Sequence, residues 1–264
     1  MTLAAALVVA LAWYVLRGLG RFWAPAARTV GRLSPYTLKA HAWVLAAPAT
    51  FAYIAIFTAS TVVQRSAPPR LIDLLTKIQS TNLSHLSRFP LRALATSALW
   101  VADGGAGLSF YVVLYAGVVA WAEPRYGTGR MVLIGLSGHV FGSLLTAAVE
   151  HRAISTGRAP QALAHTTDVG VSYIMVAGCV AAVLLMRGWW RWAGIAGLMV
   201  GVVLPEVLFH SLWNLGHLLA TLSGLAAALI LLRIAPPRRP VDLEPCLAVG
   251  QARLLSGEAA EPGQ

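Results

Sequence analysis

Serine and histidine side chains inside apolar stretches are the residues of this sequence best suited to chemistry. Ser137 stands in the motif GLSG, and Ser172 follows Gly170 in DVGVSY. A serine hydroxyl becomes a nucleophile only when a base lies within hydrogen-bond reach. His217, in the stretch GHLLATLSGL, is a candidate for that base. One hypothesis is therefore a serine–histidine dyad that hydrolyses peptide bonds.

A stripe of polar residues leads up to this histidine. Its members follow one another at steps of four, four and three: Glu206, His210, Asn214 and His217. On a continuous helix these steps place all four side chains on one face. Ionisable groups at membrane depth indicate function by default, but interhelical hydrogen bonding explains the stripe about as well.

The stripe also raises the question of a metal. His210 and Asn214 reproduce the His-x-x-x-Asn helix motif of an intramembrane metalloprotease. Such an enzyme needs paired glutamates on another helix to activate water, and no Glu-Glu occurs in the chain. We therefore expect no metal and no cofactor, and an intramembrane metalloprotease remains only a remote alternative.

The elements that must position these residues are membrane spans. The chain has 264 residues, of which 58% are hydrophobic and 11% charged. Soluble domains carry about 25% charged residues, so this composition indicates a polytopic membrane protein. Lipid offers the backbone no hydrogen-bond partners, so each span must be helical. The fold class is therefore all-α, a polytopic transmembrane helical bundle. The candidate spans are residues 2–20, 41–63, 93–121, 130–149, 168–186, 190–208 and 211–233.

Lysine and arginine lie in the short segments between the apolar stretches. If the C-terminus is cytoplasmic, 13 of them fall inside and seven outside. Cytoplasmic segments carry the excess of basic residues in membrane proteins. We therefore predict a plasma-membrane protein with its N-terminus outside and its C-terminus in the cytoplasm. The net charge is +10. Because the basic residues are scattered over the segments between the spans, this charge does not indicate nucleic-acid binding.

Two segments and one short motif carry a family resemblance. WAEPRYGTGRMVLIGLSGHVFGSLL, residues 121–145, is similar to the connection between the second and third core helices of the rhomboid family of intramembrane serine proteases. GHLLATLSGLAAAL, residues 216–229, is similar to the family's final core helix, where small residues follow a catalytic histidine. DVGVSY occupies the place of the family's G-x-S-G.

The resemblance spans about residues 41–233 and implies three parts. Residues 1–40 are expected to form an extra N-terminal transmembrane helix and a basic connector. Residues 41–233 are expected to form a rhomboid-like six-helix membrane core, and residues 234–264 a disordered cytoplasmic tail.

The resemblance also assigns roles to single residues. It implies that Ser172 is the nucleophile and His217 its base, with Gly170 and Asn214 as supporting positions. Ser137 falls in the third core helix instead of the fourth. Together with the glycines around it, Ser137 is better interpreted as a close-packing residue.

The departures from the family pattern concern the oxyanion. Rhomboids carry a histidine and an asparagine four residues apart early in the second core helix, and ALWVADGGAGLSFYVVLY contains no such pair. Tyr173 also stands where a glycine is usual. Loss of one oxyanion donor lowers turnover by roughly 100- to 1,000-fold.

Two functional hypotheses follow for this chain. One is an intramembrane serine protease that uses the Ser172/His217 dyad. The other is a catalytically inactive rhomboid-like protein that binds transmembrane segments of client proteins. Both have the same expected partners, namely the lipid bilayer and the transmembrane segments of other membrane proteins.

Overall fold

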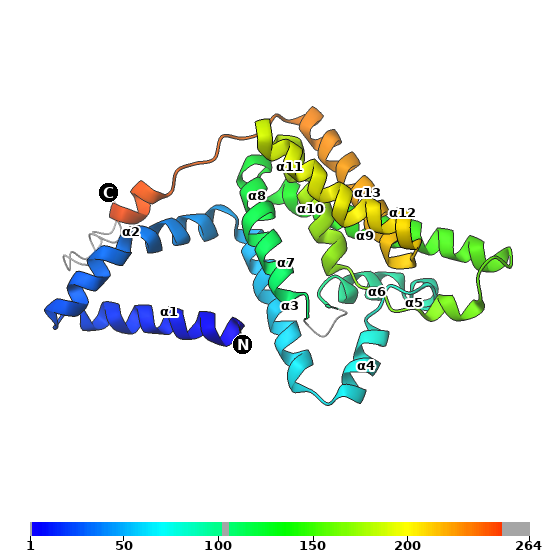
Figure 1. The fold of residues 1–264 in the computed structure, drawn as a ribbon, viewed down its shortest axis with the longest axis horizontal. Coiled ribbons are helices and arrows are strands. Elements are labelled where there is room, and N and C mark those ends of the chain that lie inside the picture. The colour runs from blue at the N-terminus through cyan, green and yellow to red at the C-terminus, as the bar shows by residue number, and fades with distance from the viewer. Residues whose placement is uncertain (1, 102–105, 250–264) are drawn as a thin grey trace, which may run out of the picture. The chain divides into compact units, whose positions relative to one another are not determined.

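The computed structural model describes residues 2–101 and 106–249 (Figure 1). Every regular element in these residues is a helix, so the predicted all-α helical bundle is confirmed. The chain divides into two compact units, residues 1–48 with 240–264, and residues 49–239. We call the second unit the membrane core, and it holds every candidate site residue.

The first unit contains α1 (Thr2–Leu19) and α2 (Ala24–Ala46). Helix α2 is continuous and tolerates Pro35 in its interior. The division of residues 1–40 into an extra transmembrane helix and a basic connector stays a prediction. The tail predicted to be disordered falls outside the described residues from position 250 onward. Its described part includes a helical turn at residues 244–249.

The membrane core holds the remaining elements. They are α3 (Pro48–Ser66), α4 (Pro69–Ile78), α5 (Leu83–Arg88), α6 (Pro90–Ser97), α7 (Leu108–Leu114), η1 (Tyr115–Val119), α8 (Ala120–Tyr126), α9 (Thr128–Ser155), η2 (Gln161–His165), α10 (Val171–Leu185), α11 (Gly188–Leu198), η3 (Met199–Val203), α12 (Leu204–Phe209) and α13 (Leu212–Ile234). Among the described residues, three helical runs are long and apolar enough to cross a membrane: α9, the run from α11 to α12, and α13. Helices α2 and α3 pass the same test when they are taken together.

The second core helix begins later than predicted. The apolar stretch suggested a span from residue 93, but residues 90–97 form the separate short helix α6 and α7 begins only at Leu108. The described residues between them, 98–101 and 106–107, are not helical. Glycine, present at Gly107, disfavours helix because it loses the most conformational freedom on folding. The span therefore consists of α7, η1 and α8.

Two of the core helices contain π-helical segments. η1 interrupts the run from α7 to α8, and η3 interrupts the run from α11 to α12. Such segments are rare and often occur at functional sites. Both segments contribute residues to the cavity beside α10 that is described in the next section.

Helix α10 is the centre of the core, and α7, η1, α9, α11 and α13 pack around it (Figure 1). Most of its 15 residues are buried. Small residues allow the neighbouring backbones to come close: a Cβ on Gly142 would lie 2.9 Å from Ala220 Cα, and a Cβ on Gly138 would overlap Ala177. The interpretation of the glycines around Ser137 as close-packing residues is therefore confirmed.

A buried carboxylate joins α3, α8 and α9. Glu123 is fully buried, and its Oε2 accepts hydrogen bonds from the backbone N–H and the hydroxyl of Thr50, at 2.8 and 2.6 Å. Its Oε1 accepts from Ala49 N at 3.0 Å and Thr128 Oγ1 at 2.9 Å. The carboxylate therefore satisfies otherwise unpaired N–H groups in the first turn of α3 and stabilises that helix end.

The helix that was expected to carry the polar stripe is broken. α12 ends at Phe209, His210 adopts a left-handed conformation with φ 47°, and α13 begins at Leu212. Ser211 caps the new helix by accepting a hydrogen bond from Asn214 N at 3.2 Å. The single polar face required one continuous helix, and the break at His210 and Ser211 does not meet this condition. The four residues therefore do not form a single helical face. His210 and Asn214 likewise do not form a His-x-x-x-Asn motif on one helix.

Candidate functional site

The start of α10 is fixed to two other segments. Gly170 N donates a hydrogen bond to Ser97 O at 2.9 Å, which ties the helix start to α6. Gly170 also lies so close to the buried ring of His139 on α9 that any Cβ would overlap it. His139 Nε2 lies 2.9 Å from Leu94 O. The close approach of the His139 ring therefore leaves room only for glycine at position 170. A supporting role of Gly170 for Ser172 stays a prediction.

A buried aspartate precedes this helix. The Asp168 backbone N–H donates to Ser80 Oγ at 2.7 Å, and its carbonyl accepts from Thr81 N at 2.9 Å. Its Oδ2 accepts from Tyr173 Oη at 2.9 Å and from Thr81 Oγ1 at 3.3 Å. The aspartate thus joins the segment at residues 80–82 to the first turn of α10.

Tyr173 connects this aspartate to His217. The two rings meet edge to face with centroids 5.3 Å apart and an interplanar angle of 79°. The ring of Tyr173 is fully buried, and its hydroxyl fills the space beside Gly216, where a Cβ would overlap it. Asp168 and His217 are therefore linked through Tyr173, which hydrogen-bonds to the aspartate and packs on the histidine.

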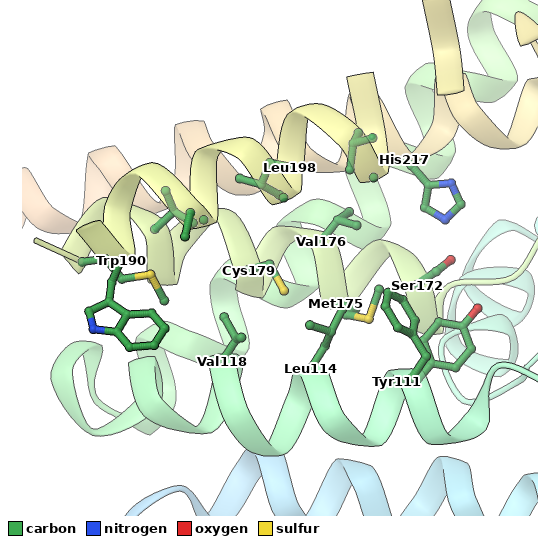
Figure 2. A pocket seen from close by; sticks show the side chains of 18 residues that line it. Tyr111, Leu114, Val118, Ser172, Met175, Val176, Cys179, Trp190, Leu198 and His217 are labelled. Carbon is green, nitrogen blue, oxygen red and sulfur yellow. The ribbon is translucent and has the colours of Figure 1, made fainter. Parts of the chain in front are cut away.

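One cavity of about 560 Å³ opens beside α10 (Figure 2). Its walls come from α7, η1, α10, α11 and η3, and most of the lining is apolar. The lining residues are Phe110, Tyr111, Leu114, Val118, Ser172, Met175, Val176, Cys179, Val183, Met186, Trp190, Ala193, Gly194, Gly197, Leu198, Gly201, Val202 and His217.

Ser172 and His217 lie at the same end of this cavity, and Trp190 lies at the other end (Figure 2). Both polar side chains are half-buried. No hydrogen bond between them is present among the described residues. The fold therefore brings the sequence-derived pair to one surface but leaves the base outside hydrogen-bond distance of the hydroxyl.

Asn214 has a different neighbour. Its side-chain Nδ2 donates to Pro205 O at 3.1 Å, so it joins the start of α13 to α12 across the break at His210. It does not line the cavity. The hydrogen bonds of Asn214 to Ser211 and Pro205 stabilise the connection between α12 and α13. Neither of them involves Ser172 or His217.

The other polar candidates serve local structure. Ser137 is half-buried on α9 and does not line the cavity. Asn82, which was considered as a replacement oxyanion donor, accepts from His85 N at 2.9 Å and caps α5. The ring Nδ1 of His85 lies 3.3 Å from Ser80 O. Asp103, another such candidate, lies outside the described residues.

Sequence reasoning missed the contact between Tyr173 and His217. Tyr173 was interpreted as an obstruction in place of a glycine, but its ring is buried in the core and packs on the histidine. A signal was present in the sequence, because Gly216 directly precedes His217 and a glycine inside an apolar helix often marks a close approach. The identity of the approaching side chain could not be read from that signal.

Comparison with known proteins gives one positive finding. Residues 42–235 match a family model whose description is rhomboid-like protein. No curated protein and no solved structure matches the chain.

Proposed function

Because the chain belongs to the rhomboid-like family, we propose that it binds a transmembrane segment of another membrane protein in the cavity beside α10. The cavity itself is the observation that supports this proposal. Its lining is apolar over most of the length of α10, and polar side chains, those of Ser172 and His217, gather at one end. An apolar helix fits the apolar part of the cavity. A locally unwound segment with free hydrogen-bonding groups fits the end that carries Ser172 and His217.

The wall of the cavity supports the same occupant. In the apolar window of the run from α11 to α12 only 6% of the residues are buried, compared with 39% in α9. The side chains of Trp190 and Val200 on this run are 71% and 63% exposed. Helix association in lipid depends on close packing more than on hydrophobicity, and Gly197 and Gly201 line the cavity with open space at their Cβ positions. A partner helix could therefore approach this wall closely.

A cross-linking experiment tests the binding. The probe is a single-span peptide of about 20 apolar residues that carries a photoreactive leucine, reconstituted in liposomes with the full chain. We expect cross-links on α7, η1, α11 and η3. The change Gly201→Leu fills the cavity and should lower the yield about tenfold, the loss that corresponds to about 1.4 kcal/mol of binding free energy.

The control is Gly117→Leu. Gly117 also lies in a π segment and has open space at its Cβ, but it does not line the cavity. The cross-link yield of Gly117→Leu should equal that of the parent. Equal yields for both variants, or cross-links spread evenly over the exposed residues of α9, would contradict the proposal.

Peptide hydrolysis is a second candidate function. The observation that favours it is the shared end of the cavity occupied by Ser172 and His217. Catalytic hydrogen bonds are often long in a free enzyme and shorten when substrate binds, so a small approach of the two side chains would give a serine nucleophile and its base. Without the family's His/Asn pair, another donor must hold the oxyanion.

A fluorophosphonate probe tests this candidate. If the dyad is active, the parent protein labels, Ser172→Ala and His217→Ala do not, and Ser137→Ala labels like the parent. If the parent stays unlabelled while an active rhomboid protease labels under the same conditions, hydrolysis is ruled out for this chain and binding alone remains.

The orientation in the membrane is part of the same proposal. The end of α8, the start of α9, the end of α10, the start of α11 and the end of α13 share one face of the membrane core (Figure 1). This face carries the arginines Arg125, Arg130, Arg187, Arg191, Arg233, Arg238 and Arg239. Because basic residues favour the cytoplasmic side, we assign this face to the cytoplasm of a plasma-membrane protein with its N-terminus outside. Modification of single cysteines by a membrane-impermeant reagent tests the assignment.

A further inference from the structure

The segment that follows α13 is held against the turn between α8 and α9. Arg130 Nη1 donates to Ala235 O at 2.7 Å, and Arg238 N donates to Arg125 O at 2.7 Å. These two bonds fix both ends of residues 235–238. The segment therefore crosses the turn along a defined path.

This path brings three guanidinium groups to one turn. Arg238 packs on Gly127, whose φ is +86°, and a Cβ there would lie 2.9 Å from Arg238 Cζ. Arg125 places its guanidinium carbon 3.8 Å above the Trp121 ring and donates to Trp121 O. Arg130 stands in the first turn of α9, two residues beyond Thr128. We call Arg125, Arg130 and Arg238 the arginine turn.

The arginine turn has no acidic counterpart among the residues that the structure describes. None of its three guanidinium groups forms an ion pair with a described residue. The acidic side chain on this turn, Glu123, is fully buried and already accepts four hydrogen bonds from α3 and α9. The positive charge is therefore available to an external anion.

We propose that the arginine turn binds the phosphate of one anionic phospholipid. A guanidinium presents paired N–H donors that match phosphate oxygens. The turn lies where α9 begins and α13 ends, and both helices are long and apolar enough to cross a membrane. Headgroup phosphates lie at this depth.

Exposed apolar side chains on the parts of α9 and α13 next to the arginine turn favour a lipid over a free anion as the ligand. Leu133 lies one turn into α9 and is 54% exposed, and Ile230 and Ile234 at the end of α13 are 58% and 74% exposed. Helices α9 and α13 pack against each other along the core. Acyl chains can therefore lie on these side chains while the phosphate reaches the arginines.

Native mass spectrometry of the full chain in detergent tests the site, with short-chain phosphatidylglycerol and phosphatidylcholine as probes. The parent should bind phosphatidylglycerol saturably and in preference to phosphatidylcholine. Arg238→Gln should weaken this binding about tenfold, equivalent to about 1.4 kcal/mol, and it leaves the Arg238 N to Arg125 O bond in place. Arg239→Gln removes the same charge from the adjacent exposed residue and should bind like the parent.

The double change Arg130→Gln with Arg238→Gln should abolish the preference, and its melting temperature in detergent reports whether the core remains folded. Three results would overturn the proposal. They are equal weakening by Arg238→Gln and Arg239→Gln, which indicates diffuse attraction; equal uptake of the two lipids; and displacement of phosphatidylglycerol by an equal concentration of inorganic phosphate.

Discussion

The hydroxyl of Tyr173 donates a 2.9 Å hydrogen bond to Asp168 Oδ2. The bond holds the fully buried Tyr173 ring in place. In this position the ring packs on His217 at the end of the cavity. The segment before α10, the first turn of α10 and the second turn of α13 are thereby coupled. The following predictions test this coupling and the packing around it.

The change Tyr173→Phe should destabilise the folded protein. It removes one donor from a buried carboxyl group while it keeps the aromatic ring, and an unsatisfied buried acceptor costs about 1–3 kcal/mol. Unfolding in detergent, followed by circular dichroism, measures the loss. Tyr36→Phe is the control, because Tyr36 is 72% exposed and its change should be nearly neutral. Equal stability of the two variants would show that the bond contributes nothing.

The change Gly216→Ala should destabilise the core strongly. The new methyl group would overlap the Tyr173 hydroxyl, which cannot move without leaving Asp168. Overpacking of this kind costs about 1–3 kcal/mol. Gly197→Ala is the matched control, because nothing lies near its Cβ position and alanine favours helix by up to about 1 kcal/mol. Melting temperatures of the two variants should move in opposite directions.

The change Glu123→Ala should be among the most damaging in the core. It leaves the N–H groups of Ala49 and Thr50 without their acceptor at the start of α3. With about 1–3 kcal/mol for each buried unsatisfied group, the expected loss is several-fold larger than for an exposed carboxylate such as Glu244. Resistance to unfolding in detergent compares the two. A stable Glu123→Ala variant would show that water replaces the carboxylate.

The helical architecture was predictable from the sequence, because a single chain segment that crosses lipid must be a helix. A backbone in lipid must satisfy its own hydrogen bonds, so apolar stretches of sufficient length become helices. The pairing of Ser172 with His217 was predicted separately, from the family resemblance. The structure places both on one cavity, although no hydrogen bond joins them among the described residues.

Details that depend on packing between distant segments were not predictable. The spacing of Glu206, His210, Asn214 and His217 suits one face of a continuous helix, but spacing contains no information on the left-handed residue at His210. The bonds of Asp168 to Ser80 and Thr81 join positions almost 90 residues apart. A single sequence contains no signal for such a contact.

The run from α11 to α12 is attached by a short connection at each end. Met186 and Arg187 alone separate it from α10, and His210 and Ser211 alone separate it from α13. Neither end can therefore swing away from the core while the neighbouring helices stay intact. The π-helical segment η3 lies between the two ends, and helices bend most readily at such segments. An entering segment would therefore widen the cavity at the middle of the run, while Ser172 and His217, which lie on α10 and α13, would keep almost the same separation.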